Sequence, residues 1–399
     1  MAREPDDRPV AVHFVPTYYE LTENWIQTQL QNLRRYRPLV LTMQTDNLNG
    51  DFISDHYALR ERSWWEYTAN RLWYWAAGYH FSFARLLRRQ HAQLLHVHFG
   101  HHSWQIGLPL ARISGLPLVT TFYGYDLSRL PQSDVAWRQR YQDLFRLGAC
   151  FLVEGPYMAE QLHELGCSTK KTVVQHLGVD LTRFTYRPRE LHPGEPLRLL
   201  AAGRFTEKKG LVYAVEAIAR LAKQGYAVNL TLIGDAGASA ENQAAKRCIL
   251  QAIHANHLQD QVILRGMQPY SELRQAYYEH HVFLAPSVQA ADGDNEGGAP
   301  VTVIEAAATG MPVVGTNHCD IPEVVQHGVT GLLAPERDST ALADHLAWFY
   351  HNSNQLRQMG VMARQHIETE YNAARQGERL AEIYDKVLYS HGSGSKNIG

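Results

Sequence analysis

Short runs of apolar residues alternate with longer stretches in which apolar residues recur at helical spacing, along the whole chain. Runs such as LRLLAAG and VNLTLIG are apolar at nearly every position, as strands buried on both faces of a parallel sheet are. Repeated strand–helix alternation predicts an α/β protein with parallel sheets. The expected strands are 10–15, 38–42, 94–99, 117–122, 150–153 and 172–177 in the first half, and 197–202, 229–234, 262–264, 282–285, 312–315 and 331–333 in the second.

A proline-rich, charged segment, YRPRELHPGEP at 186–196, interrupts this alternation. Such a composition is typical of a linker between domains. We therefore expect an N-terminal domain over 1–185 and a C-terminal domain of similar size over 197–375. A helix over 376–390 is expected to close the fold, and the Gly/Ser-containing residues 391–399 to form a disordered tail.

One predicted helix, 71–89, is unusually aromatic, and six arginines but only two glutamates lie between residues 60 and 89. One interpretation is an amphipathic helix whose apolar side packs on a sheet. The other is a basic, aromatic surface that touches a membrane or a lipid-linked acceptor. The sequence pattern leaves both open.

Composition narrows the class of protein. Hydrophobic residues are 45% and charged residues 20%, so the chain can bury sizeable cores. The formal net charge of −2 argues against a nucleic-acid partner. The four cysteines are scattered without a CxxC pair, which favours a reducing cytosol over a disulfide framework or a zinc site. With neither an apolar signal core nor a long apolar run, we expect a cytoplasmic protein with at most peripheral contact to the inner membrane face.

The first segment with recognisable chemistry is GRFTEKKG at 203–210, which follows an expected strand and opens a helix over 211–223. A glycine turn before a helix presents free backbone N–H groups and the positive end of the helix dipole to an anion. Arg204 can fork to phosphate oxygens and Lys209 supplies a point charge, so a diphosphate suits this loop. An ordinary solvated loop with two surface cations is the alternative.

The second segment is DGDNEGGAP at 292–300, before a helix expected over 301–309. Its glycines again provide backbone amides, and its carboxylates can accept hydrogen bonds from sugar hydroxyls. Glu305 lies in the helix among apolar residues, where a carboxylate is more often functional or paired than free. The acidic start of the loop also resembles a calcium-binding EF-hand loop, but Val303 replaces its twelfth, bidentate glutamate.

The third segment is HVHFGHH at 96–102, at the end of a strand. Four histidines so close together raise the possibility of zinc, whereas their place at the carboxyl edge of a parallel sheet favours lining a ligand site. The segment YGYD at 123–126 follows the next strand and should reach the same edge.

Taken together, these segments resemble the retaining glycosyltransferases of family 4. AAGRFTEKKG resembles the diphosphate loop of that family, and the segment 285–335, which includes EGGAPVTVIEAAATG, resembles its donor-binding signature. HVHFG, PLVTTFYGYD and HLGVDLTRF match more loosely in the first half, and the likeness is strongest to members that build bacterial exopolysaccharides. The resemblance implies the GT-B fold, in which two Rossmann-like parallel-sheet domains face a cleft.

The resemblance also implies roles for residues of the second half. Arg204 and Lys209 would neutralise the donor diphosphate and stabilise the leaving group. Glu305 would accept from the ribose hydroxyls, and Glu296 would contact the transferred sugar. Eight residues separate Glu296 from Glu305, one more than in the family pattern, so the place of Glu296 depends on a bulge in the loop.

Three further residues complete the implied donor site. Gly298 and Ala299 would offer backbone amides to the donor sugar or phosphate, and Met267 would lie at the nucleobase. Fixed cations take the place of a metal in this scheme, so neither a metal nor another cofactor is expected.

On the acceptor side, the resemblance points to His98, Tyr123 and Asp126. Tyr123 stands where many relatives have histidine. A tyrosine can donate a hydrogen bond there but cannot be a cation at neutral pH. His98 is therefore a candidate for the catalytic role of the missing histidine.

The expected function is transfer of a sugar from a UDP- or GDP-sugar to a saccharide or lipid-linked acceptor, with retention, in polysaccharide or glycoconjugate synthesis. Two alternatives stay open. One is a GT-B enzyme that acts as a phosphorylase or nucleotide-sugar epimerase. The other is a catalytically idle nucleotide-sugar-binding partner of another transferase.

Overall fold

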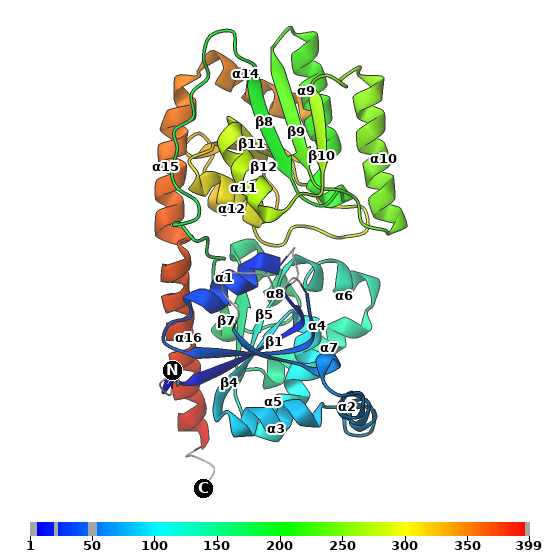
Figure 1. Cartoon of the computed structure of the whole chain (residues 1–399), viewed down its shortest axis with the longest axis vertical. Helices are drawn as coiled ribbons and strands as arrows, with labels where there is room; N and C mark the ends of the chain where they lie inside the picture. The colour runs from blue at the N-terminus through cyan, green and yellow to red at the C-terminus, as the bar shows by residue number, and fades with distance from the viewer. Residues whose placement is uncertain (1–5, 20–22, 47–53, 396–399) are drawn as a thin grey trace. The chain divides into compact units, whose positions relative to one another are not determined.

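The computed structural model describes residues 6–19, 23–46 and 54–395, and the chain divides into two compact α/β units (Figure 1). The first unit comprises Met1–Gly178 and Ala373–Gly399, and the second comprises Val179–Asn372. The chain thus passes between the units twice.

The first unit ends before the expected linker at 186–196, and that segment folds as part of the second unit. Arg189 is the reason. Its buried guanidinium donates to the backbone oxygen of Tyr277 at 2.6 Å and to Oγ1 of Thr309 at 2.9 Å. Because Arg189 satisfies these buried acceptors, it holds the segment 186–196 in place, although the composition of the segment is that of a free linker.

The first unit is built on a parallel sheet in the order β3-β2-β1-β4-β5-β6-β7. The short edge strand β3 was not expected, because its sequence DHYA is half polar. The strands are β1 Val10–Tyr18, β2 Arg37–Thr45, β3 Asp55–Ala58, β4 Ala92–His98, β5 Leu118–Thr121, β6 Cys150–Val153 and β7 Thr172–Val174.

Side chains alternate across this sheet, so its two faces pack in separate clusters. One face, with Val12 and Phe14, packs on helices α3, α5, α7 and α8. The other face, with Ala11 and Leu94, packs on α16. The helical segments are α1 Asn24–Asn32, η2 Leu59–Glu61, α2 Trp64–Ala77, α3 Phe81–Arg89, α4 Gly100–His102, η3 Ser103–Gly107, α5 Leu108–Ser114, η4 Gly124–Asp126, α6 Arg129–Ser133, α7 Ala136–Leu147, α8 Pro156–Glu164, η5 Thr169–Lys171 and α16 Ala373–Ser395.

The closing helix α16 is longer than the expected 376–390. It includes residues 391–395, so the prediction of a disordered tail is wrong for them, while 396–399 lie outside the described residues. Leu380, Ile383 and Tyr384 bury one side of the helix on the first sheet, and His391 Nε2 lies 2.9 Å from the backbone oxygen of Gly115. These contacts hold the helix beyond the point at which its sequence turns rich in Gly and Ser.

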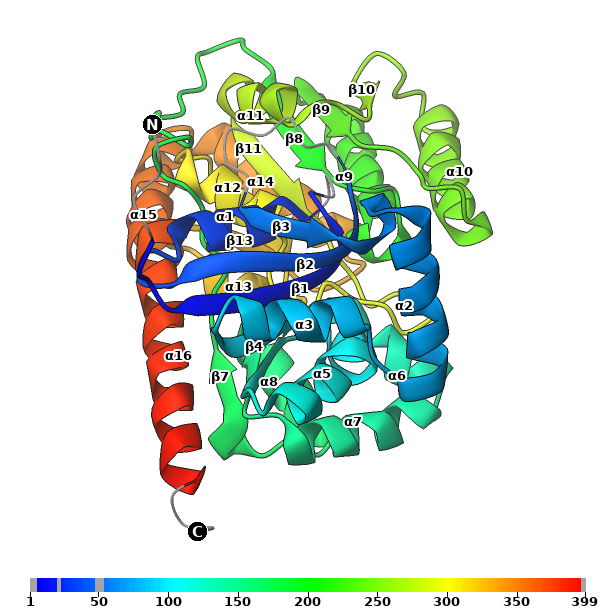
Figure 2. The same cartoon turned by 60° about the horizontal axis from the view of Figure 1, so that its bottom comes forward.

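The single helix expected over 71–89 is two helices, α2 and α3. Gly78 ends α2 with φ 78°, a left-handed conformation that suits glycine. Helix α3 buries Phe83, Ala84 and Leu87, so the core-packing interpretation holds for this half. Helix α2 stands at the outer edge of the first unit (Figures 1 and 2). Its Tyr67 and Tyr74 pack against the same core, whereas Leu72 and Trp75 are exposed.

The second unit has a parallel sheet in the order β10-β9-β8-β11-β12-β13. Its strands are β8 Leu197–Ala202, β9 Val228–Ile233, β10 Val262–Gly266, β11 Val282–Ala285, β12 Val313–Thr316 and β13 Gly331–Ala334. Its helical segments are η6 Glu207–Lys209, α9 Leu211–Lys223, α10 Ala240–Ala255, α11 Tyr270–Glu279, α12 Val301–Ala308, α13 Ile321–Val324, α14 Ser339–His351 and α15 Asn354–Glu370. Every strand expected from the sequence is present in one of the two sheets.

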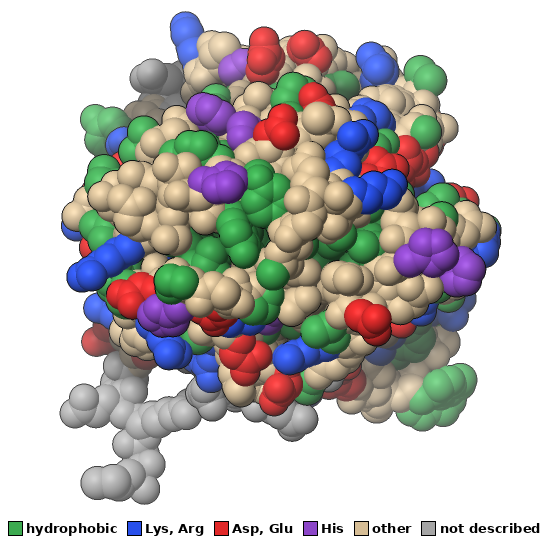
Figure 3. Space-filling view, turned by 90° about the horizontal axis from the view of Figure 1, so that it is seen from above, with side chains coloured by type: hydrophobic (Ala, Val, Ile, Leu, Met, Phe, Trp, Pro, Cys, Tyr) green, Lys and Arg blue, Asp and Glu red, His purple; other side chains and the backbone are tan. Residues whose placement is uncertain are grey.

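The surface matches the near-neutral charge. Lys, Arg, Asp and Glu side chains are interspersed on the face seen in Figure 3, where the described residues form no continuous positive field. None of the described helices combines the length and the apolar character needed to cross a bilayer.

The close approach of α16 to α1 is testable at Gly377, where an added Cβ would lie 2.1 Å from the backbone oxygen of Asn32. We expect Gly377→Ala to lower the free energy of unfolding by about 1–3 kcal/mol, as overpacking does. Urea unfolding followed by circular dichroism measures it. Gly392→Ala in the same helix is the control, because no atom lies within 4 Å of the added Cβ. A Gly377→Ala variant that is stabilised, as helix propensity alone would predict, would contradict the packing.

Candidate functional site

The loop between β8 and α9 lies against the segment that follows β11, the neighbouring strand. Gly210 has φ 60°, and a Cβ there would lie 1.8 Å from the backbone oxygen of Pro286, so only glycine fits. The amide of Val288 donates to the backbone oxygen of Lys208 at 2.8 Å. Because parallel strands end at the same edge of the sheet, two distant loops meet here.

This meeting brings together two residues predicted from the sequence, Lys209 and Glu296. Lys209 Nζ lies 2.9 Å from Oε1 and 3.0 Å from Oε2 of Glu296, and Ser287 Oγ donates to Oε1 at 2.8 Å. Burial alone would raise the pKa of Glu296, but Lys209 and its neighbour Lys208 hold the pKa below the usual range. The carboxylate is therefore charged, although it is buried.

The other two cations of the loop differ from each other. Lys208 Nζ pairs with Asp294 at 3.1 Å and donates to the backbone oxygen of Asn295 at 2.9 Å. Arg204 is exposed and forms no ion pair with any residue that the structure describes. Arg204 is therefore the cation of this loop that can meet an incoming anion without first giving up a carboxylate.

The glycine-rich loop is held by a histidine that the sequence reasoning missed. The amide of Glu296 donates to Nε2 of His318 at 3.2 Å, and Nδ1 of His318 lies 2.7 Å from Oε1 of Glu336. Nε2 thus accepts and Nδ1–H donates, which fixes the tautomer of the ring. His318 and Ser287 follow β12 and β11 closely, and that position at the carboxyl edge is the signal that could have identified them.

Glu305 lies in a different group. It is 2% exposed, Tyr277 donates to its Oε2 at 2.8 Å, and Tyr270 donates to its Oε1. Burial raises the pKa of Glu305 to about 7. Both tyrosines escaped the sequence reasoning, because nothing in the spacing of α11 relates them to α12.

The remaining donor-side residues lie on nearby loops of the same unit. Gly298 and Ala299 are buried in the loop before α12, and Met267 follows β10 with 58% of its surface exposed. An exposed methionine at a strand end is free to lie on a planar ligand, as the resemblance implies.

In the first unit, the predicted residues His98 and Tyr123 are in contact. Nδ1 of His98 lies 2.7 Å from the Tyr123 hydroxyl. Asp126 differs from the expectation, because it is fully buried and its oxygens accept from the amides of Gly100 at 2.6 Å and Tyr123 at 2.8 Å. Asp126 therefore shapes the loop and does not itself face an acceptor.

The histidines do not group as their sequence spacing suggested. His101 and His102 stay apart from His96 and His98, whose buried rings instead meet His13 of β1. Ligand atoms of these three lie within 4.8 Å of one another. His13 carried no signal in the sequence, because it stands alone in an apolar strand.

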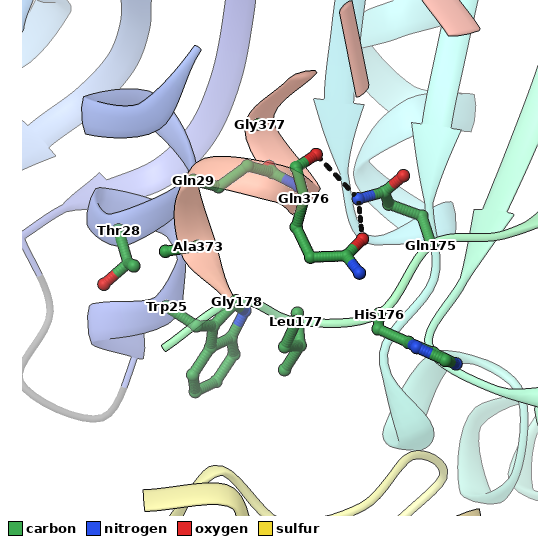
Figure 4. A pocket seen from close by; sticks show the side chains of 10 residues that line it. All are labelled: Trp25, Thr28, Gln29, Gln175, His176, Leu177, Gly178, Ala373, Gln376 and Gly377. Atoms are coloured by element: carbon green, nitrogen blue, oxygen red, sulfur yellow. Dashed lines mark hydrogen bonds between the residues drawn. The ribbon is translucent and has the colours of Figure 1, made fainter. Parts of the chain in front are cut away.

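A small pocket in the first unit was also not expected (Figure 4). It lies between α1, the segment Gln175–Gly178 and the start of α16. Nε2 of Gln175 donates to Oε1 of Gln376 at 2.7 Å, which leaves the buried Oε1 of Gln175 without a donor among the described residues. Gln29 Oε1 is likewise buried without a donor among the described residues.

The raised pKa of Glu305 makes a pH-dependent prediction. Its pKa rises from 4.5 to about 7 on folding, so its contribution is fully present below pH 4.5 and is lost as the pH rises through 7. The loss should approach roughly 3 kcal/mol, at about 1.4 kcal/mol per pKa unit. Urea unfolding at several pH values should show the wild type losing stability against Glu305→Gln over this range. A constant difference between the two proteins would contradict the buried, neutral form.

Comparison with known proteins agrees with the resemblance. Two protein-family models match the chain, Glycosyltransferase Family 4 over residues 25–183 and Glycosyl transferases group 1 over residues 182–366. The amylovoran biosynthesis glycosyltransferase AmsK of Erwinia amylovora is 35% identical over 299 residues, 74% of this chain and 70% of that protein. A protein of Escherichia coli strain K12, named provisionally as the colanic acid biosynthesis glycosyltransferase WcaL, is 35% identical over 73% of this chain and 70% of its own.

Solved structures show the fold. Anabaena HepE in complex with UDP and glucose matches with a TM-score of 0.75 at 16% identity, over 95% of this chain and all of that one. Sucrose-phosphate synthase from Thermosynechococcus elongatus matches with a TM-score of 0.76 at 19% identity, over 96% of this chain and all of that one. With two Rossmann-like parallel-sheet units and family matches along most of its length, this chain has the GT-B fold and belongs to glycosyltransferase family 4.

Proposed function

We propose that the chain transfers a sugar, with retention, from a UDP-sugar to a saccharide or lipid-linked acceptor in the synthesis of an extracellular polysaccharide. The observation that carries the proposal is the Lys209–Glu296–Ser287 group, with its buried carboxylate, in the neighbourhood of the exposed Arg204 at the carboxyl edge of the second sheet. The relatives named for amylovoran and colanic acid synthesis support the class of product. UDP is the first choice of nucleotide because HepE was solved with UDP and with UDP-glucose, and GDP is the alternative.

In this proposal, fixed positive charge stabilises the departing nucleotide. Lys209 is neutralised by Glu296 and Lys208 by Asp294, so Arg204 provides the uncompensated charge that attracts the diphosphate. Once bound, the diphosphate shares the Lys209 ammonium with Glu296, whose other oxygen can accept from a sugar hydroxyl. The amides of Gly298 and Ala299 add donors that need no reorganisation during the reaction.

The chemical step follows from this charge distribution. The bond between the anomeric carbon and the phosphate oxygen of UDP breaks as the acceptor oxygen bonds to that carbon on the same face. The proton of the acceptor hydroxyl passes to the departing phosphate. The scheme needs no metal and no protein nucleophile. Proton NMR of the product, compared with the donor, tests retention through the anomeric coupling, and an inverted product would reject it.

Arg204 and Lys209 should both be needed for donor binding. Because a hydrogen bond to a charged group contributes about 1.5–3 kcal/mol, Arg204→Ala should weaken UDP binding roughly tenfold or more. UDP, GDP and their glucose conjugates can be compared by the rise in melting temperature that a ligand of the folded state produces. Arg357→Ala, an exposed arginine on α15, is the matched control and should bind normally.

Lys209 needs a second variant, because Lys209→Ala leaves Glu296 buried and unpaired. That variant should lose both stability and UDP binding. The double variant Lys209→Ala/Glu296→Gln removes the unpaired charge, so it should regain stability without regaining UDP binding. A double variant that binds UDP as the wild type does would show that Lys209 is structural only.

We further propose peripheral attachment to the membrane through the exposed side of α2. Its tryptophan face consists of Trp64, Trp65, Leu72, Trp73 and Trp75, all exposed, with Trp75 at 89%. At about 100° of rotation per residue, all but Trp73 fall within roughly 100° of arc on one side of the helix. So many clustered, exposed tryptophans are unusual for a surface that meets only water, and tryptophan favours the membrane interface.

The charge of the segment that contains the tryptophan face fits an anionic surface. The segment carries six arginines against two glutamates: Arg60, Arg62, Arg71, Arg85, Arg88 and Arg89 against Glu61 and Glu66. A basic residue near an anionic bilayer contributes about 1 kcal/mol, which falls as salt screens it. Attachment of this kind would bring the first unit to a lipid-linked acceptor.

Vesicle flotation tests the attachment. The wild type should float with phosphatidylcholine vesicles that contain phosphatidylglycerol and come off at high salt. Trp64→Ser/Trp75→Ser should reduce binding tenfold or more, because each buried aromatic side chain contributes roughly 1.5–3 kcal/mol. Trp348→Ser, in the second unit, is the control and should float normally. A wild type that never floats at low salt would favour a water-soluble acceptor.

A further inference from the structure

Three histidines of the first sheet point to one face because of strand register. His13 of β1 is paired with His96 of β4, and His98 lies two residues further along β4, so all three share a face. Helix α16 covers that face and contributes Tyr384. All four side chains are fully buried.

Hydrogen bonds join these groups in a single line. The Tyr123 hydroxyl lies 2.7 Å from Nδ1 of His98, and Nε2 of His98 lies 3.1 Å from Nδ1 of His13. Nε2 of His13 lies 3.4 Å from the Tyr384 hydroxyl, which lies 2.5 Å from Nδ1 of His96. Nε2 of His96 ends the line, 2.7 Å from Oγ1 of Thr121.

Every ring in this line is neutral. Burial lowers the pKa of His13 to about 3 and holds the pKa values of His96 and His98 well below their ordinary value. Burial likewise raises the pKa values of Tyr123 and Tyr384 well above 10, so both keep their protons. Each imidazole therefore has one nitrogen that donates and one that accepts.

When the Tyr384 hydroxyl accepts from one of its two histidines and donates to the other, neutrality allows only two complete patterns of donation along the line. If Tyr123 donates to His98, then His98 donates to His13, His13 to Tyr384, Tyr384 to His96, and His96 to Thr121. All three histidines then carry their proton on Nε2. In the reverse pattern all three carry it on Nδ1, His98 donates to Tyr123, and the Tyr123 proton is free to point elsewhere.

We propose that His98, His13, Tyr384 and His96 are positioning residues, joined in one directional hydrogen-bonded chain that sets whether the Tyr123 hydroxyl donates inward or offers its proton to a sugar hydroxyl of the acceptor. The acceptor role of Tyr123 rests on the proposed function, whereas the hydrogen-bonded chain of side chains does not. The direction of donation along the hydrogen-bonded chain decides whether the Tyr123 hydroxyl donates to His98 or accepts from it. The closing helix, through Tyr384, thereby acts on a residue of β5's loop.

A metal ion held by the three histidines is the rival explanation of the same cluster. A metal requires ring nitrogens whose lone pairs are directed at a shared centre. Here each of the six ring nitrogens already has a hydrogen-bond partner within the line. The cluster is complete as a hydrogen-bonded chain, so it needs no ion to satisfy it.

The test is the tautomer of each histidine, read from long-range proton–nitrogen NMR spectra of protein labelled in its histidine rings. Replacing His13, His96 and His98 one at a time by Gln assigns the signals. We expect all three rings in the wild type to be neutral and to share one tautomer. Different tautomers among the three would overturn the proposal, as would stoichiometric zinc in the purified protein together with metal-shifted ring signals.

Tyr384→Phe removes the hydroxyl that links His13 and His96 in the hydrogen-bonded chain, so the ring signals of both histidines should move. Tyr36→Phe is the matched control, because the Tyr36 ring packs 5.2 Å from that of Tyr384 while its hydroxyl donates to Asp385, outside the chain. It should leave the three tautomers unchanged. If Tyr384→Phe does not fold, Tyr123→Phe serves, and the His98 signals should move. Unchanged signals in the folded variant would overturn the proposal, whatever the outcome of the UDP-binding experiments.

Discussion

Parallel strands bring their carboxyl ends to the same edge of a sheet, and the candidate site of the second unit depends on that constraint. Residues of the loops after β8, β11 and β12 are far apart in sequence, yet Lys209 contacts Glu296, and Glu296 contacts His318. Gly210 makes the approach possible, since no side chain fits beside Pro286. In the first unit, the same register argument places the histidines of β1 and β4 side by side.

The surroundings of three buried carboxylates decide what each can do. Glu296 has two lysines nearby and stays charged. Glu305 and Asp126 have only neutral donors, tyrosine hydroxyls in one case and backbone amides in the other, and burial raises the pKa of each to about 7. The charged Glu296 is suited to interact electrostatically with a ligand, whereas Glu305 and Asp126 organise the residues around them.

Strand positions and the local chemistry of single loops could be predicted from the sequence. The pairing of Lys209 with Glu296 lay within reach, because both follow strands of one sheet. His13 and Tyr384 could not be predicted, because a contact across the whole chain leaves no periodic signal. Arg189 was missed for the opposite reason: the composition of its segment is that of a linker, and only its buried acceptors show otherwise. The break at Gly78 was visible in the sequence, but helical spacing on both sides of it suggested continuity.

The two chain crossings, at Gly178 and Ala373, have a consequence for how the protein is made. The residues of the first unit up to Gly178 are synthesised before the second unit, whereas α16 follows the second unit in the chain. During synthesis, one face of its sheet, with Ala11, Leu94 and the histidine cluster, stays uncovered while the second unit emerges and can already fold as a continuous stretch. The nascent first half therefore stays partly open, and a recombinant fragment of it would lack the helix that covers one face of its sheet unless residues 373–395 were supplied with it.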